Sequence, residues 1–180
     1  MSHGENEFFY LSPAPMMIVD IESTAEIFER INSGESHKSR RIFAENVRIK
    51  HANSAALQLY EAVSSEEIAR RFSEIIGPEG KEDLDKINYL LTSGERFFRV
   101  ETVNRTLKGR LINVLLHIAV SESNGVPDFS NIMVYSKDIT EGKMLQDKLR
   151  ILSVLPEANP NIVVIMQCQN KVEYLNPAAR

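Results

Sequence analysis

The sequence predicts an α+β fold in which a five-stranded antiparallel sheet carries helices on one face and is followed by a C-terminal linker helix. Two short β-prone segments lie in the first third of the chain, and three longer alternating segments lie between residues 96 and 138. Helical periodicity fills the interval between these two groups and returns after Thr140. Runs of strands separated by runs of helices are typical of α+β domains.

The strands are predicted from alternation and from β-prone composition. Five segments have this character: 15–21, 47–51, 96–106, 110–121 and 129–138. The last three are joined by short polar connections with glycine, so they are expected to form an antiparallel meander.

The helices are predicted from apolar residues that recur every three or four positions. The expected helices cover 24–32, 54–60, the stretch from Ser64 to Phe72, 81–92 and 140–152. Asn53 is the expected N-cap of the second helix, and Ser64 with Glu67 has the spacing of a capping box. The polar residues 22–45, which hold the first helix, are interpreted as an insertion between the first two strands.

Composition limits the classes of function. The chain is 43% hydrophobic and 26% charged with a net charge of −4, as expected of a soluble globular protein without a basic surface for nucleic acid. No apolar run approaches the ~20 residues that span a bilayer, and the start of the chain does not resemble a signal peptide. Cys168 is the single cysteine, so a reducing, cytoplasmic location is expected.

An internal repeat is present. The segment 160–166 resembles 15–21, and the segment 171–179 resembles 48–56, which places Asn176 where Asn53 lies in the first copy. We therefore expect three parts: a sensor domain over 1–139, a linker helix over 140–154, and the truncated start of a second domain over 155–180.

These features resemble PAS sensor domains. The resemblance rests on the turn at 12–15 and its strand, the run Ala52-Asn-Ser-Ala-Ala56, the Thr106-Leu-Lys-Gly109 turn, and Asp138-Ile-Thr140 before a charged helix. The first copy is similar to a PAS variant with a helical insertion, found in multi-PAS histidine kinases and diguanylate cyclases. The resemblance implies a non-catalytic module that receives a signal and relays it to a covalently linked output domain beyond Arg180. A sensor histidine kinase is the expected parent; the alternative is a small-molecule binding domain that regulates a diguanylate cyclase or a transcriptional output.

The resemblance also bears on cofactors. Flavin-binding members carry a reactive cysteine that the first copy lacks, and haem-binding members use a histidine on the helix that corresponds to 81–92, which has none. We expect neither a flavin adduct nor haem, and the cofactor stays unknown. A pocket for a small molecule would be lined by candidate residues Tyr60, Phe72, Leu90, Phe97, Leu115 and His117. The alternative is that these residues fill an ordinary core.

Neither a catalytic site nor a metal site is predicted. The four histidines are scattered, and Cys168 has no partner at ligand spacing. An enzyme of a different α+β fold would have to use His51, His117, Glu101 and Tyr135, which are the polar groups left to it.

The junction after the last strand is the expected signal relay. Asp138, Ile139 and Thr140 connect that strand to the linker helix, where Thr140 can cap the helix and Glu141 lies at the positive end of its dipole. Leu145, Leu149 and Leu152 follow coiled-coil spacing, so we expect a homodimer through this helix. A plain amphipathic linker is the alternative.

Overall fold

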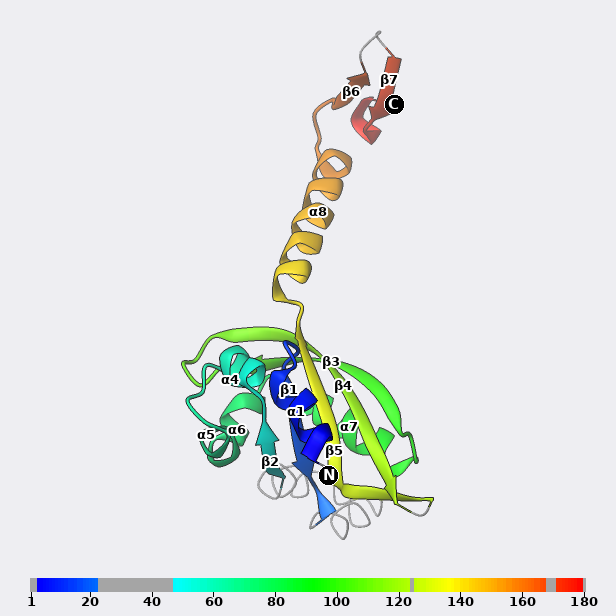
Figure 1. Cartoon of the computed structure of the whole chain (residues 1–180). Coiled ribbons are helices and arrows are strands. Elements are labelled where there is room, and N and C mark those ends of the chain that lie inside the picture. Colours follow the sequence, from blue (N-terminus) through cyan, green and yellow to red (C-terminus); the bar gives the residue numbers. More distant parts are fainter. Residues whose placement is uncertain (1–2, 23–46, 124, 168–170, 180) are drawn as a thin grey trace. The chain divides into compact units, whose positions relative to one another are not determined.

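The computed structural model describes residues 3–22, 47–123, 125–167 and 171–179. The chain divides into two compact units, Met1–Ile139 and Thr140–Arg180. The first unit holds a five-stranded sheet, and the second holds a long helix and a two-stranded sheet (Figure 1). Apart from Glu22, the predicted insertion at 22–45 and its helix over 24–32 lie outside the described residues.

The main sheet is antiparallel, and its strand order is β2-β1-β5-β4-β3. Its strands are β1 (Met16–Asp20), β2 (Arg48–Ala52), β3 (Phe97–Arg105), β4 (Leu111–Ser123) and β5 (Val126–Asp138). The predicted fold class is therefore confirmed. The β4–β5 hairpin is longer than predicted, because a register shift after Val120 lets pairing continue to Ser123 and Val126.

Four helices follow β2 along the chain: α4 (Ser54–Tyr60), α5 (Ser65–Arg70), α6 (Phe72–Ile76) and α7 (Lys81–Thr92). The predicted caps are present, because Asn53 accepts from the Ala56 amide and Ser64 from the Glu67 amide. The predicted helix from Ser64 to Phe72 is instead two helices that meet at Arg71.

Arg71 explains this break. Its backbone leaves the helical region, and its guanidinium donates to the carboxylates of Glu67 and Glu74 and to the Leu107 carbonyl. The side chain thus ties α5 and α6 to the β3–β4 turn. The contact with Leu107 joins residues 36 positions apart, so helical periodicity alone does not predict it.

A helix at the start of the chain, α1 (His3–Leu11), was not predicted. It lies against the face of the sheet opposite to α4–α7, where the Tyr10 hydroxyl contacts Nδ1 of His51 on β2 at 3.0 Å. Phe9 of α1 and Ile18 of β1 are buried, yet neither belongs to the main core cluster. Tertiary contacts therefore hold a helix whose own amphipathic pattern is short.

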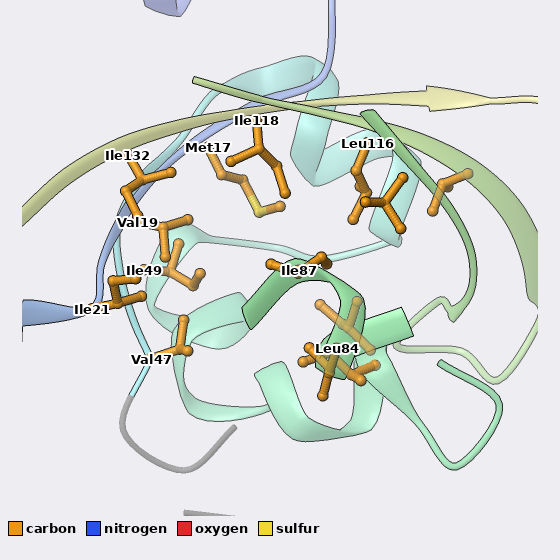
Figure 2. Close-up of a cluster of buried hydrophobic side chains, with 14 of the residues drawn as sticks. Met17, Val19, Ile21, Val47, Ile49, Leu84, Ile87, Leu116, Ile118 and Ile132 are labelled. Carbon is orange, nitrogen blue, oxygen red and sulfur yellow. The ribbon is translucent and has the colours of Figure 1, made fainter. Parts of the chain in front are cut away.

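The main core lies between the sheet and helices α4–α7. Strand β3 alternates between exposed and buried residues, with Phe98, Val100, Thr102 and Asn104 facing inward. Figure 2 shows how side chains from β1, β2, β4, β5 and α7 point toward one another in this layer. Alternation on the strands thus sets which side chains meet the helices.

The second unit contains α8 (Thr140–Ala158), β6 (Val164–Gln167), β7 (Lys171–Leu175) and a short 3-10 helix, η2 (Pro177–Ala179). Helix α8 begins at Thr140, as predicted. It ends at Ala158, beyond the predicted end of the helix at residue 152 and of the linker at residue 154. Among the described helices, none combines the length and apolar character needed to cross a bilayer.

Candidate functional site

A cavity of about 90 Å³ lies between the inner face of the sheet and helices α4, α6 and α7. Its wall is mostly apolar. The lining residues are Met17, Val19, Ile21, Val47, Tyr60, Phe72, Ile76, Gly80, Leu84, Ile87, Leu91, Thr102, Asn104, Leu116, Ile118, Ile132 and Val134. Figure 2 shows many of them converging from the sheet and from α7. The cavity is the candidate site for a small molecule.

One end of the cavity is polar. The fully buried Tyr60 hydroxyl donates to Ser136 Oγ at 3.1 Å and accepts from Asn104 Nδ2 at 3.1 Å. This chain of hydrogen bonds joins α4 to β3 and β5, because Asn104 lies on β3 and Ser136 on β5. Thr102, also on β3, adds a buried hydroxyl to the cavity wall.

The cavity wall carries no aspartate, glutamate, lysine, arginine or histidine among the residues that line it in the described structure. Burial raises the pKa of the Tyr60 phenol above its ordinary value, so this hydroxyl is protonated at neutral pH. The lining is therefore uncharged under ordinary conditions.

Gly80 makes close approach possible at the start of α7. A Cβ atom there would lie 2.9 Å from the Ile76 carbonyl oxygen and 3.0 Å from the Val103 carbonyl oxygen. Both atoms belong to the backbone, so they cannot easily move aside. The absence of a side chain at Gly80 thus lets α7 pack onto β3 beside the cavity.

Of the six residues predicted to line a pocket, two line the cavity and four do not. Tyr60 and Phe72 line the cavity. Leu90 packs against the core, half-buried, but is not part of the cavity wall. Phe97, Leu115 and His117 do not line this cavity, because their positions on β3 and β4 have the parity of the outer face.

His117 and Tyr135, two of the polar residues considered for an enzyme, lie on the outer face of the sheet, opposite to the cavity. His117 lies between the rings of Phe97 and Tyr135, with centroids 6.4 and 5.1 Å away. Burial, and to a smaller extent the charges of Arg99 and Lys137, lower the pKa of His117. Neither His117 nor Tyr135 lines the cavity, and the same holds for His51 and Glu101.

Metal binding has no structural support in the residues described. Over those ranges, no group of three or more histidine, cysteine, aspartate or glutamate side chains is arranged to hold an ion.

Sequence reasoning missed most of the cavity wall. The inward-facing residues of the two strands are Thr102 and Asn104 on β3 and Leu116 and Ile118 on β4. On β4 they are neighbours of the predicted Leu115 and His117, which face outward. A signal was available: the polar residues Thr102 and Asn104 continue the face of β3 that begins with Phe98 and Val100.

The junction residues connect the cavity strand to the long helix. Strand β5 contributes Ile132 and Val134 to the cavity and ends at Asp138, two residues before α8 begins at Thr140. The Ile139 amide donates to the Asn113 carbonyl oxygen on β4 at 2.8 Å, which fixes the end of the strand. Glu141 lies in the first turn of α8.

The linker leucines are solvent-exposed where the structure describes their side chains. Leu145 is 53% exposed and Leu149 is 69% exposed. Leu152 lies on the same helix, three residues further along the chain. An apolar stripe thus begins on α8.

The hairpin of the second unit repeats the first hairpin pair by pair. In β1–β2 the pairs are Met17 with Ala52, Ile18 with His51, Val19 with Ile49, and Asp20 with Arg48, with a register shift after Ile18. In β6–β7 they are Val164 with Leu175, Ile165 with Tyr174, Met166 with Val172, and Gln167 with Lys171, with the shift after Ile165. Pro160 therefore corresponds to Pro13, two positions from the alignment that the sequence suggested.

Comparisons with known proteins place the fold. The sequence matches no protein-family model and no curated protein. Solved structures match over most of the chain. They share an α+β fold in which an antiparallel sheet, here in the order β2-β1-β5-β4-β3, is covered by helices.

The domain has the fold of PAS and light-oxygen-voltage domains, as predicted. A light-oxygen-voltage (LOV) domain studied with a flavin analogue is 17% identical with a TM-score of 0.56, over 84% of this chain and 98% of that one. A LOV protein of Rhodobacter sphaeroides is 16% identical with a TM-score of 0.53, over 86% and 81%. An RNA-binding LOV receptor has a TM-score of 0.60 at 13% identity over 84% of this chain, which spans only 36% of that receptor.

Proposed function

We propose that residues 3–139 form a sensory module that passes a change at the cavity through β5 to α8, and from there to an output domain. A single observation carries this proposal: β5 lines the cavity with Ile132 and Val134 and continues through Asp138 into the start of α8. A ligand or partner that repositions β5 therefore acts on the beginning of the helix. The module itself performs no catalysis in this proposal.

The relay is tested by altering the cavity from β5 without a ligand. Val134→Ala enlarges the cavity, whereas Met133→Ala changes the neighbouring residue, which pairs with Ile18 and Ala119 on the outer face. We expect Val134→Ala to change amide hydrogen exchange over residues 140–150, and Met133→Ala to leave it within error. Equal effects of the two substitutions, or none over 140–150, would contradict the relay.

The parent protein is proposed to be a sensor histidine kinase that works in the cytoplasm. Support comes from the resemblance to inserted PAS variants and from the single cysteine of the chain. A diguanylate cyclase or a transcriptional regulator is the alternative output. The coding sequence after the codon for Arg180 tests this: a phosphoacceptor helix with an ATPase domain supports the kinase, and a Gly-Gly-Asp-Glu-Phe motif supports the cyclase.

Residues 159–179 are proposed to be the first hairpin of a second module of the same fold. Besides the shared register, the burial of the corresponding residues in the first unit supports this assignment. Val164, Met166 and Val172 are 43, 55 and 48% exposed, whereas their counterparts Met17, Val19 and Ile49 are 3, 6 and 7% exposed in the first unit. The same face is thus apolar in both hairpins, as a core face is.

A further inference from the structure

We propose that the cavity binds a compact, uncharged molecule that carries one hydroxyl or amide group, with this group held at the polar end formed by Tyr60, Asn104 and Thr102. This inference rests on the proposed sensory function and specifies the chemical class of its ligand. Size, charge and hydrogen-bonding chemistry each limit that class.

The volume sets the size. A cavity of about 90 Å³ is smaller than one of roughly 150 Å³ that takes up benzene. Pockets for drug-sized ligands have about 300–1,000 Å³. A molecule of about three to five non-hydrogen atoms therefore fits the cavity without displacing its walls.

The absence of acidic and basic side chains from the cavity wall limits the charge of the bound molecule. No acidic or basic side chain lines the cavity in the described structure, and the buried Tyr60 phenol stays protonated. A carboxylate or ammonium group placed there would lose its hydration without gaining an ion pair, which costs several kcal/mol. Charged metabolites are thus disfavoured.

The hydrogen bonds of Tyr60 with Ser136 and Asn104 determine which polar group of a ligand fits the cavity. The Tyr60 proton is directed at Ser136, so the phenol oxygen faces its other neighbours as an acceptor. The Asn104 amide and the Thr102 hydroxyl offer both donor and acceptor atoms. A hydroxyl or amide can donate and accept in turn, so it matches this end of the cavity better than a group that only donates or only accepts.

The remaining wall favours an apolar body. Ile87, Ile118 and Val134 line the cavity from three different elements, α7, β4 and β5. Burial of each additional methylene against such a wall contributes about 0.8 kcal/mol to transfer from water. A short alcohol or amide therefore satisfies both ends of the cavity.

Three probes with five non-hydrogen atoms each test the class: 1-butanol, n-pentane and n-butylammonium. Each is titrated into the intact chain while the methyl NMR signals of Ile87, Ile118 and Val134 are followed. We expect saturable shifts with 1-butanol, about fivefold weaker binding of n-pentane, and no saturable shift with n-butylammonium. The Leu115 methyl signals, on the outer face, serve as the control and should not respond.

Two substitutions test the polar end. Tyr60→Phe and the isosteric Thr102→Val should each weaken 1-butanol binding about fivefold and leave n-pentane binding unchanged. Thr102→Val keeps the test valid where Tyr60→Phe fails to fold. Phe97→Leu, on the outer face, is the matched control and should change neither affinity.

The inference is overturned where n-butylammonium binds as well as 1-butanol, where both substitutions leave 1-butanol binding unchanged, or where none of the probes shifts the cavity methyl signals. These outcomes are separate from failure of the relay, because the exchange experiment with Val134→Ala uses no probe. Binding without a change over 140–150 would contradict the relay alone.

Discussion

Asn53 and Asn176 hold the starts of two hairpins by corresponding hydrogen bonds. Asn53 Oδ1 accepts from the Met16 amide, and Asn53 Nδ2 donates to the carbonyl oxygens of Ser12 and Ala14. Asn176 makes the same three bonds one repeat later, with the Val163 amide and the carbonyl oxygens of Asn159 and Asn161. Both side chains are fully buried, so each amide fixes the turn that precedes its first strand.

The first prediction concerns this clamp. Asn53→Ala removes a buried amide and leaves several backbone groups without partners, so the free energy of unfolding of the first unit should fall by about 3 kcal/mol. Urea denaturation measures the change. Gln58→Ala, at an exposed position of α4, is the control and should cost less than about 0.5 kcal/mol. Similar costs for the two substitutions would refute the role of the clamp.

Asn176→Ala tests the corresponding clamp in the second unit. We expect amide exchange to accelerate over β6 and β7, while the unfolding transition of the first unit stays unchanged, because the two asparagines contact different hairpins. A shift in the transition of the first unit would contradict this independence.

The second prediction concerns the bond between Tyr60 and Ser136. Tyr60→Phe removes the hydroxyl but keeps the ring, and should lower the free energy of unfolding by about 1.5 kcal/mol, since Ser136 and Asn104 lose a buried partner. In a double-mutant cycle with Ser136→Ala, the coupling should be about 0.5–1.5 kcal/mol. Additive effects within about 0.3 kcal/mol would argue against a direct interaction.

The third prediction concerns Gly80. Gly80→Ala should destabilise the first unit by about 1–3 kcal/mol, because the new methyl group meets two backbone carbonyl oxygens. Gly142→Ala is the control: a methyl group there meets nothing within 4 Å, and alanine favours helix α8. Thermal unfolding distinguishes them. A neutral Gly80→Ala would show that α7 is not packed closely onto β3.

The fourth prediction concerns dimerisation through α8. Replacement of Leu145 and Leu149 together by glutamate should weaken self-association at least about tenfold, because charges then lie in an apolar seam. Sedimentation equilibrium measures the dissociation constant. Gln146→Glu adds charge at an exposed position one residue away and should have a smaller effect. A strictly monomeric unmodified chain would exclude the dimer.

The fifth prediction concerns pH. His117 has a lowered pKa in the folded state, so its neutral form is favoured by folding. The associated stability is present above the ordinary pKa of 6.5 and is lost as the pH falls through the folded-state pKa. In an NMR titration, His117 should titrate below 6.5, and Lys137→Gln should raise its pKa by removing a nearby positive charge. Lys108→Gln, on an exposed turn, should leave it unchanged.

Local patterns were sufficient for much of the fold. Asn53 and Ser64 cap helices as predicted because a side chain and an amide three residues away form the cap. The Thr106-to-Gly109 turn also follows from local chemistry: Thr106 Oγ1 accepts from the Arg110 amide, and Gly109 adopts a φ of 94°.

The candidate site was predicted only in part, because several strands are apolar on both faces. Leu115 and Leu116 are adjacent on β4, and Phe97 and Phe98 are adjacent on β3. Hydrophobicity therefore does not determine which member of each pair faces the helices, and a shift of one residue moves a side chain to the opposite face.

By itself the sequence determined the five strands, the caps and the strand-to-helix junction at Thr140, since each depends on residues close together along the chain. It also revealed the repeat, because two distant segments have similar residues in the same order. Tertiary structure alone decided the position of α1, the break at Arg71, the two-residue shift in the repeat and the wall of the cavity. These depend on hydrogen bonds and packing between residues that are distant in sequence, such as Asn104 and Tyr60, and their partners are chosen only when the sheet and helices come together.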